Sequence, residues 1–566
     1  MTKRCVIVII IATMYIDTSH SKQHGKIYTR YLLRENYREE GKVKHRTVAN
    51  LSHCSKLEIA AIKLALKHKH DLNMLSTDEI KFKNTQGLSV GADWLLYDFA
   101  KQLGIIKALG NTRNGKLALL QVISRIIDQG SRLSAVRIAS HHALSDILGL
   151  EGFDEDDLYA NLDWLAEEQE NIEDRLFKQL GSGDVRLFLY DVTSSYLEGE
   201  CNELAAYGYD RDGKNGKLQI VIGLLCNQEG IPLSIQVFTG NTSDMKTLSS
   251  QIEKAAKRFG AKKVTFVGDR GMIKSAEVKD LKEQGFYHIT AITKAQINTL
   301  LNNGMIQLGL FDEEVHEVID ENGERFILRR NPIRAEELEQ SRKSKLQSLQ
   351  KFVTTKNEYL RQHKQAKAEI ALRDVTNKAR RLKIADWLMI TAIEREITVK
   401  TDEQRLQQAK ELDGCYVIKT DLPEADASKE TIHERYKDLA LVEWAFRTSK
   451  TTFLELRPIY VRLASRTRGH ALVVMLAYRM IRELSQRWRE FDLTVEEGIK
   501  NLTTLCTMEV QINERTYYNQ IPKPNDLLQQ LFVKANVVLP EVLPKVNSGK
   551  AKVATRKKLP TERKNI

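Results

Sequence analysis

The strongest constraint on the fold is an ordered alternation of strand and helix patterns between residues 185 and 292. Apolar runs typical of strands and amphipathic runs typical of helices follow one another there. The sequence predicts strands at 185–192, 218–226 and 231–238, a helix at 244–259, a strand at 263–268, a helix at 274–284 and a strand at 286–292. The polar turn at 227–230 makes the second and third strands an antiparallel hairpin. The region therefore predicts a mixed α/β sheet.

Three strands followed by helix, strand, helix and strand is the element order of the ribonuclease H-like fold. Residues 293–430 do not continue the alternation. They contain a highly charged helical stretch at 334–383 and strand-like runs at 387–392 and 415–418. We predict an α/β fold with a ribonuclease H-like mixed sheet and an insertion before the last helix of that fold.

The flanking segments predict additional modules. Residues 26–50 alternate as strands around the turn at 39–41, and the pattern from about 56 to 182 is helical. The predicted organisation is a β-hairpin module at 1–55, a helical region at 56–182 that is either a DNA-binding region or a packed bundle, the first part of the mixed sheet at 183–292, the insertion at 293–430, closing helices at 431–490, and C-terminal helices with a basic tail at 491–566.

Charge and cysteine usage narrow the class of protein. The chain of 566 residues has 87 Lys and Arg against 75 Asp and Glu, a net charge of +12, which favours a polyanionic partner. Its six cysteines form no C-x-x-C pair, which fits a reducing compartment. The apolar run at 5–12 is too short for a membrane span, and Met14 is an alternative start that would make residues 1–13 an annotation artefact. We expect a soluble cytoplasmic protein.

Three acidic residues are candidates for catalysis. Asp191 and Asp269 end predicted strands, and Glu443 lies on a predicted helix. Carboxyl ends of strands in an α/β sheet share a crevice, so distant carboxylates can converge there on metal ions. Hard oxygen ligands suit Mg²⁺ and Mn²⁺, and a pair of such ions serves phosphodiester chemistry. Taken alone, Asp191 is as well explained as a helix cap or turn residue.

The helix around Glu443 has a regular spacing. One helical stripe contains Tyr436, Leu439, Glu443, Phe446, Arg447 and Lys450. A carboxylate within a partly apolar stripe calls for a metal ion or a basic partner, because an unpaired buried charge is costly. The alternative is an ordinary surface ion pair between Glu443 and Arg447.

Several motifs together resemble the bacterial insertion-sequence transposases of the DDE class, in the group whose acidic helix carries a YREK signature. The similarity extends over about 185–485 and more weakly over the N-terminal hairpin. Its motifs are at 191–193, 207–213, 218–225, 238–244, 268–272 and 436–460.

This resemblance implies that Asp191, Asp269 and Glu443 are a catalytic triad holding two Mg²⁺ or Mn²⁺ ions. It further implies binding of terminal inverted repeats and target DNA, cleavage at the element ends, strand transfer, and a dimer in the synaptic complex. The residues implied in DNA binding are Arg270, Tyr436, Arg447 and Lys450. Leu439 stands where the signature has Arg and cannot contact phosphate, which puts the hairpin-forming route of cleavage in doubt.

Other interpretations remain open. A degenerate transposase could occupy inverted repeats as a repressor without catalysis, and a ribonuclease H-like nuclease could act in repair or RNA processing. Arg270 could form a local ion pair, Trp444 could stack on an extruded base or belong to the core, and His470 has a structural role by default. A basic stretch suited to phosphate contacts, or to a solvated face, consists of Lys450, Arg457, Arg462, Arg466 and Arg468.

Overall fold

The computed structural model describes most of the chain. The described residues are 13–23, 26–39, 42–69, 82–180, 187–199, 201–209, 216–259, 264–270, 272–273, 275–450, 454, 456, 459–512 and 515–543. These ranges do not include residues 1–12, the basic tail, Arg457, or the motif positions 210–213 and 271. The chain divides into two units, residues 1–87 with 507–521, and residues 88–506 with 522–566. No helix in the described part is long and apolar enough to cross a bilayer.

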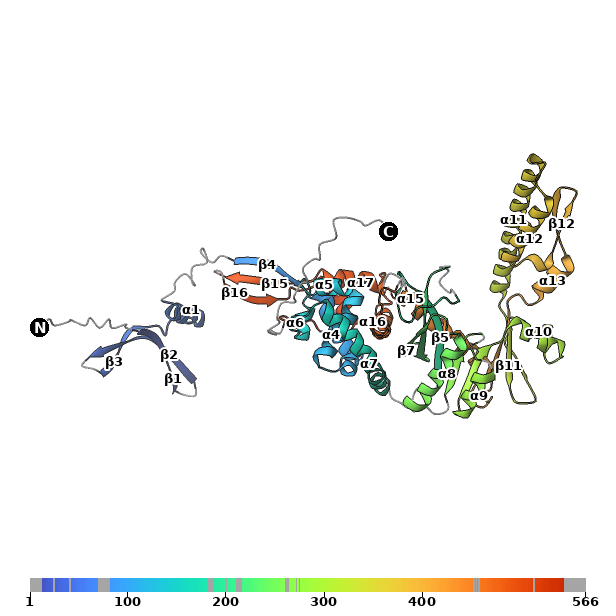
Figure 1. Cartoon of the computed structure of the whole chain (residues 1–566). Helices are drawn as coiled ribbons and strands as arrows, with labels where there is room; N and C mark the ends of the chain where they lie inside the picture. Colours follow the sequence, from blue (N-terminus) through green and yellow to red (C-terminus); the bar gives the residue numbers. More distant parts are fainter. Residues whose placement is uncertain are drawn as a thin grey trace. The chain divides into compact units, whose positions relative to one another are not determined.

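The first unit contains two small sheets (Figure 1). Strands β1 (Thr13–Gln23), β2 (Lys26–Glu39) and β3 (Lys42–Asn50) form an antiparallel sheet, so the expected hairpin is present with an additional strand. Helix α1 (Lys56–Lys67) begins at a capping box in which Ser55 and Glu58 satisfy each other's backbone N–H groups. Strands β4 (Phe82–Ser89), β15 (Cys506–Ile512) and β16 (Arg515–Gln520) form the second sheet. β4 lies in a region for which the sequence predicted only helices.

The helical part of the second unit joins two distant stretches of sequence. It comprises α2 (Gly91–Gln102), α3 (Ile105–Leu109), α4 (Arg113–Ile127), α5 (Arg132–Ile138), α6 (Leu144–Leu148), α7 (Glu155–Gln179), α16 (Ala464–Arg487), α17 (Val495–Thr503) and α18 (Asp526–Lys534). Side chains of Thr112, Ser131, Asp154 and Thr494 cap the first turns of four of these helices. The apolar helix α16 packs against α4 and α7 and also against β7, so it connects the helical part to the central sheet.

An eight-stranded mixed sheet forms the centre of the second unit. Its strands are β5 (Leu187–Tyr196), β6 (Gln219–Asn227), β7 (Pro232–Thr239), β8 (Thr265–Gly268), β9 (Tyr287–Ala291), β10 (His316–Ile319), β11 (Arg325–Arg330) and β14 (Cys415–Thr420). The spatial order is β10-β11-β14-β9-β8-β5-β6-β7, in which β5, β8 and β9 are parallel and the other neighbours antiparallel. The predicted strand and helix order from 185 to 292 is confirmed in the described residues.

Two helices follow strands of this sheet. α8 (Asp244–Glu253) continues into a π-helical segment (Lys254–Arg258), and α9 (Ser275–Glu283) lies between β8 and β9. A core of aromatic and aliphatic side chains lies between the strands and these helices, with Phe177 stacked on Phe259 and Phe188 beside Phe266. Burial of such large apolar surfaces is the main source of stability for the sheet.

The segment at 293–430 both extends the sheet and forms a separate cluster. After α10 (Lys294–Asn302), strands β10, β11 and β14 add to the sheet beside β9. Between them, α11 (Pro332–Gln362), α12 (Ala368–Arg381), β12 (Leu388–Ile393), β13 (Glu396–Thr401) and α13 (Glu403–Glu411) share their own apolar core. The single helical stretch predicted at 334–383 is wrong in one respect. His363 ends α11, and α12 folds back because its apolar face packs on α11 and on β12.

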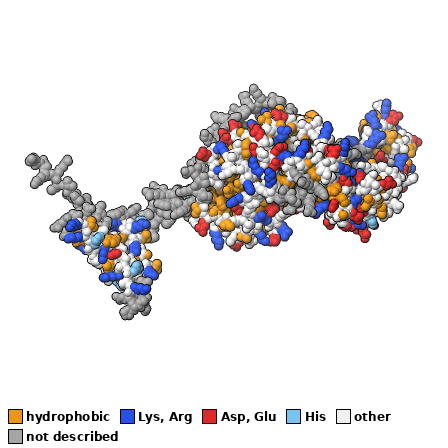
Figure 2. Space-filling view, turned by 90° about the horizontal axis from the view of Figure 1, so that it is seen from below, with side chains coloured by type: hydrophobic (Ala, Val, Ile, Leu, Met, Phe, Trp, Pro, Cys, Tyr) orange, Lys and Arg blue, Asp and Glu red, His pale blue; other side chains and the backbone are white. Residues whose placement is uncertain are grey.

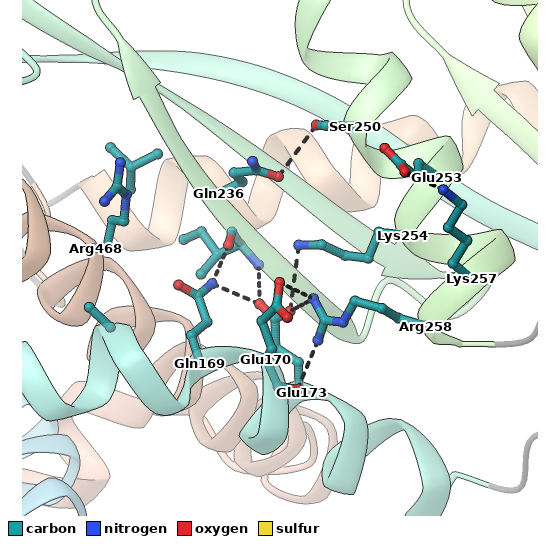
Figure 3. Close-up of a pocket in the computed structure, with 13 residues that line it drawn as sticks. Gln169, Glu170, Glu173, Gln236, Ser250, Glu253, Lys254, Lys257, Arg258 and Arg468 are labelled. Atoms are coloured by element: carbon teal, nitrogen blue, oxygen red, sulfur yellow. Dashed lines mark hydrogen bonds and ion pairs between the residues drawn. The ribbon is translucent and has the colours of Figure 1, made fainter.

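Side chains of helix α7 form hydrogen bonds with the backbone at the outer edge of β7, which is the last strand in the sheet order. The Ile235 backbone N–H donates to Glu173 Oε1 at 3.2 Å, and Gln169 Nε2 donates to the Ile235 carbonyl at 2.5 Å. A cavity of about 510 Å³ adjoins these contacts (Figure 3). Pairing with α7 leaves less of the β7 backbone open to another chain.

Candidate catalytic site

The strand register brings the two predicted aspartates to neighbouring positions. β5 and β8 are parallel, with Tyr190 opposite Gly268. Asp191 directly follows Tyr190, and Asp269 directly follows Gly268. Neighbouring strands lie about 4.8 Å apart, so the backbones of these two residues are close although 78 positions separate them in sequence (269 − 191).

Asp191 lies in the middle of β5 and is half-buried. The Val192 backbone N–H donates to its Oδ1 at 2.8 Å. The pKa of Asp191 is raised to about 7, mainly by burial and also by the negative charges of Asp269, Glu443 and Asp244, while the Val192 hydrogen bond opposes the shift. All three neighbouring carboxylates are therefore close enough to act on Asp191.

Glu443 lies on α15 (Leu439–Lys450), which packs on β5. Its side chain is exposed, as is that of Arg447. The buried positions of α15 are Leu439, Val442, Ala445, Phe446, Ser449 and Lys450. Glu443 and Arg447 are thus exposed members of the partly apolar stripe, so burial cost supplies no argument for a metal role.

Tyr436 is not on the same helix as Glu443. It lies in the last turn of α14 (Lys429–Lys437), and Asp438 separates α14 from α15. The prediction that one helical stripe contains both residues is therefore wrong at this point. Asp438 itself has helical φ and ψ of −61° and −16°, and its N–H bonds to the Glu434 carbonyl as in a helix, so the break is confined to one turn residue.

The phenol of Tyr436 nevertheless faces the site. It donates to Asp269 Oδ1 at 3.5 Å, a long hydrogen bond. Burial and the charge of Asp269 raise the pKa of Tyr436, so the phenol stays protonated and can act as a donor. The Asp269 backbone is held by bonds to its carbonyl from Thr290 Oγ1 at 3.3 Å and from the Met272 N–H at 3.1 Å.

The donor chemistry of these residues fits a divalent cation, but their spacing does not form a closed site. Among the described residues, no three His, Cys, Asp or Glu side chains are arranged to hold a metal ion as they stand. Carboxylates repel one another until a cation lies between them, and Asp269 and Glu443 are exposed side chains that could rotate inward. Asp191, Asp269 and Glu443 supply the hard oxygen atoms that Mg²⁺ and Mn²⁺ prefer.

The predicted DNA contacts differ in exposure. Arg270 and Arg447 are exposed, whereas Lys450 is only 9% exposed, which leaves it little access to a phosphate. Leu439 is buried at the start of α15. Trp444 is 40% exposed and lies edge-on to Tyr478, so it is not a core residue; with Arg447 it lines a groove of about 510 Å³.

The basic stretch is also divided among different contacts. Arg466 forms an ion pair with Asp163 at 3.0 Å, and Arg462 is exposed. Arg468 lines the cavity beside β7 rather than the acidic site (Figure 3). His470 is buried and hydrogen-bonded to Arg132, in agreement with a structural role.

Sequence reasoning missed one acidic neighbour. Asp244, the first residue of α8, raises the pKa of Asp191 by its charge. It lies in the motif at 238–244, in the first turn of a helix, where an acidic residue is favourable without any catalytic role.

The raised pKa of Asp191 predicts that the stability of the metal-free protein falls as the pH rises from about 4 to 7. The native pKa of about 7 exceeds the reference value of 3.8, so the folded chain binds the extra proton in this range. In chelator, the melting temperature should drop by a few degrees between pH 5 and pH 8, and Asp191→Asn should flatten that slope. Equal slopes for both proteins would contradict the assignment.

Comparisons with known proteins were made against families, curated proteins and solved structures. The family model described as transposase DDE domain matches residues 183–480, more than half of the chain. The model described as IS1634 family transposase, N-terminal domain, matches residues 16–76. No curated protein matches. A solved piggyBac transposase synaptic complex with hairpin DNA is similar at 11% identity and a TM-score of 0.34, covering 75% of this chain and 82% of that chain.

Proposed function

The chain belongs to the DDE transposases of insertion sequences, and from this membership we propose that it binds the terminal inverted repeats of its own element, cuts there and joins the freed 3′-hydroxyl to target DNA. The observation that carries the proposal is the parallel register that sets Asp191 beside Asp269. Glu443, on the helix packed against β5, completes the acidic site.

The residues have separate roles in this proposal. Asp191 and Asp269 would hold divalent cations between them, and Glu443 would supply the remaining carboxylate. When bound, a pair of such ions activates the attacking oxygen and stabilises the leaving oxygen. Tyr436 positions Asp269 by donating to its carboxylate. Arg270, Arg447 and Lys450 would contact DNA, with Lys450 the weakest candidate because it is buried.

The sheet supports a ribonuclease H-like catalytic core. The five strands from 187 to 291 lie in the order β7-β6-β5-β8-β9, with the antiparallel hairpin on one side of β5 and the parallel strands on the other. In this arrangement Asp191 lies on the central strand of the five, and Asp269 follows the adjacent parallel strand. The strands β14, β11 and β10 would then extend the core beyond β9.

DNA-end binding would involve the N-terminal part of the chain. In the described residues from 13 to 69, Lys and Arg outnumber Asp and Glu by 12 to 4. Figure 2 shows many basic and few acidic side chains on this unit, at the left of the view. Such a surface suits the phosphate backbone, because most sequence-independent affinity for DNA is electrostatic. The helical region at 56–182 is the second candidate, and pairing two ends would require a dimer.

The test is cleavage of a labelled duplex carrying the inverted repeat that flanks the gene, with Mg²⁺, Mn²⁺ or chelator. We expect nicking at the repeat boundary in either metal and none in chelator. Specific binding without cleavage in any metal would contradict the enzymatic proposal and favour a repressor. Nicking of RNA or of unrelated duplexes, without joined products, would favour a nuclease.

A further inference from the structure

A short segment beyond β5 presents two exposed tyrosines. Tyr207 and Tyr209 are 69% and 79% exposed, and Gly208 separates them. Large aromatic side chains are costly to leave in water, so two at adjacent outward positions call for an explanation. Both tyrosines belong to the motif at 207–213, and no residue of this motif is part of the candidate catalytic site.

The segment is fixed to the sheet by its backbone. Ala206 and Gln219 exchange two backbone hydrogen bonds of 3.1 Å each. Gln219 Nε2 donates to the Tyr209 carbonyl at 3.0 Å and to the Gly240 carbonyl at 2.9 Å. The exposed tyrosines are therefore carried on a held backbone rather than on a loose loop.

Gly208 lies between the two tyrosines at a closely packed position. A Cβ atom at position 208 would lie 2.1 Å from the Gly240 carbonyl oxygen, so this residue faces the end of β7 with no room for a side chain. Position 208 is therefore closed by Gly240, whereas the side chains of Tyr207 and Tyr209 on either side of it are exposed.

The distance to the acidic site can be estimated from strand register. Gln219 lies opposite Tyr196, and Leu224 lies opposite Asp191. Five residues of strand span about 16 Å at about 3.3 Å per residue. For stacked nucleotides, which rise about 3.4 Å each, that distance corresponds to about five nucleotides from a phosphate held at Asp191, and for an unstacked strand, whose nucleotides each span more, to fewer.

We propose that Tyr207 and Tyr209 form a base-stacking site for a single DNA strand that leads away from the acidic site. Exposed aromatic rings on a rigid support stack on bases of any sequence. The Glu203 N–H, four residues before Tyr207, donates to the carbonyl of the exposed Arg462 at 3.1 Å, so a basic residue is attached to the same stretch of chain. The inference rests on the proposed function, because positions along the unpaired DNA strand are counted from the proposed cleavage site.

The test uses a duplex of the element's end in which one strand continues past the boundary as eight unpaired nucleotides. 2-Aminopurine is placed singly at each unpaired position. For the wild-type protein we expect fluorescence quenching strongest about five nucleotides from the boundary, within the range allowed by the strand estimate. The Tyr207→Ala/Tyr209→Ala variant should lose this quenching and about 5- to 100-fold in affinity for the extended duplex.

Two variants keep the result interpretable. The Tyr207→Phe/Tyr209→Phe variant retains both rings and should quench like the wild type. Tyr359→Ala, which removes a 54% exposed tyrosine from α11, should change nothing. If the double Ala variant unfolds, each single Ala variant provides the same comparison. Unchanged quenching and affinity in folded Ala variants would overturn the inference.

Failure of this inference is distinguishable from failure of the proposed function. If the wild-type protein cleaves at the boundary and the Ala variants bind and quench equally, only the stacking site is wrong. If the wild-type protein never cleaves, the proposed activity is wrong, whereas quenching by the wild type and its loss in the Ala variants would still support a stacking site.

Discussion

Asp191→Asn, Asp269→Asn and Glu443→Gln are each expected to reduce DNA end cleavage by at least about 10³-fold, because residues that act as one catalytic unit fail together. Each change removes a negative charge from the group around Asp191 while keeping the size of the side chain. Binding of the inverted repeat should be retained, since none of the three carboxylates attracts a phosphate. The measurements are single-turnover cleavage and equilibrium binding on the same labelled duplex.

Two comparisons make this prediction specific. Glu434→Gln alters an exposed carboxylate of α14, close in sequence to Tyr436, and should cleave at the wild-type rate. Double variants within the triad should be no slower than single ones, because the unit is already inactive. Near-normal cleavage by any single variant would remove that residue from the catalytic site.

Much of the fold could be predicted because it is encoded locally. The strand and helix order from 185 to 292 follows from periodicity, and the hairpin between β6 and β7 follows from its turn. The break at Asp438 could not be predicted, because both sides of it are helical and only tertiary packing sets their relative direction. β4 was missed for a similar reason, since its partner β15 lies more than 400 residues later in sequence.

The candidate site shows the same limit. The position of Asp269 at a strand end could be read from the sequence, whereas Asp191, which was predicted to end a strand, lies in the middle of β5. The proximity of the two depends on the parallel pairing of β5 with β8. Helical spacing suggested that Glu443 is buried, but its side chain is exposed. The face of α15 that packs on β5 contains other residues, such as Val442 and Phe446. Similarly, a Tyr-Gly-Tyr sequence does not show which residue faces the sheet.

Glu173→Ala is expected to have the largest effect on stability. Glu173 is fully buried on α7, and its carboxylate accepts from Ser234 Oγ at 3.0 Å and from the Ile235 N–H at 3.2 Å. Lys254 Nζ and an Arg258 guanidinium nitrogen lie 3.5 and 3.4 Å from its Oε2. Both cations come from the π-helical segment, at its first and last residues (Figure 3).

Removal of this carboxylate would leave two largely buried cations without their shared partner and the β7 edge without an acceptor. Breaking a buried ion pair on one side costs about 3 to 5 kcal/mol. The free energy of unfolding, measured by urea denaturation, should fall by that amount in Glu173→Ala. Glu173→Gln should fall between this variant and the wild type, because it keeps an acceptor for the Ile235 N–H but loses the charge.

Glu253→Ala is the matched control, because it removes an exposed carboxylate that pairs with Lys257 on the same helical stretch. Exposed pairs of this kind contribute little, so its unfolding midpoint should equal that of the wild type. A midpoint for Glu173→Ala equal to that of Glu253→Ala would show that Lys254 and Arg258 are hydrated in solution. The edge of β7 would then be held by Gln169 and apolar packing, not by the charged cluster.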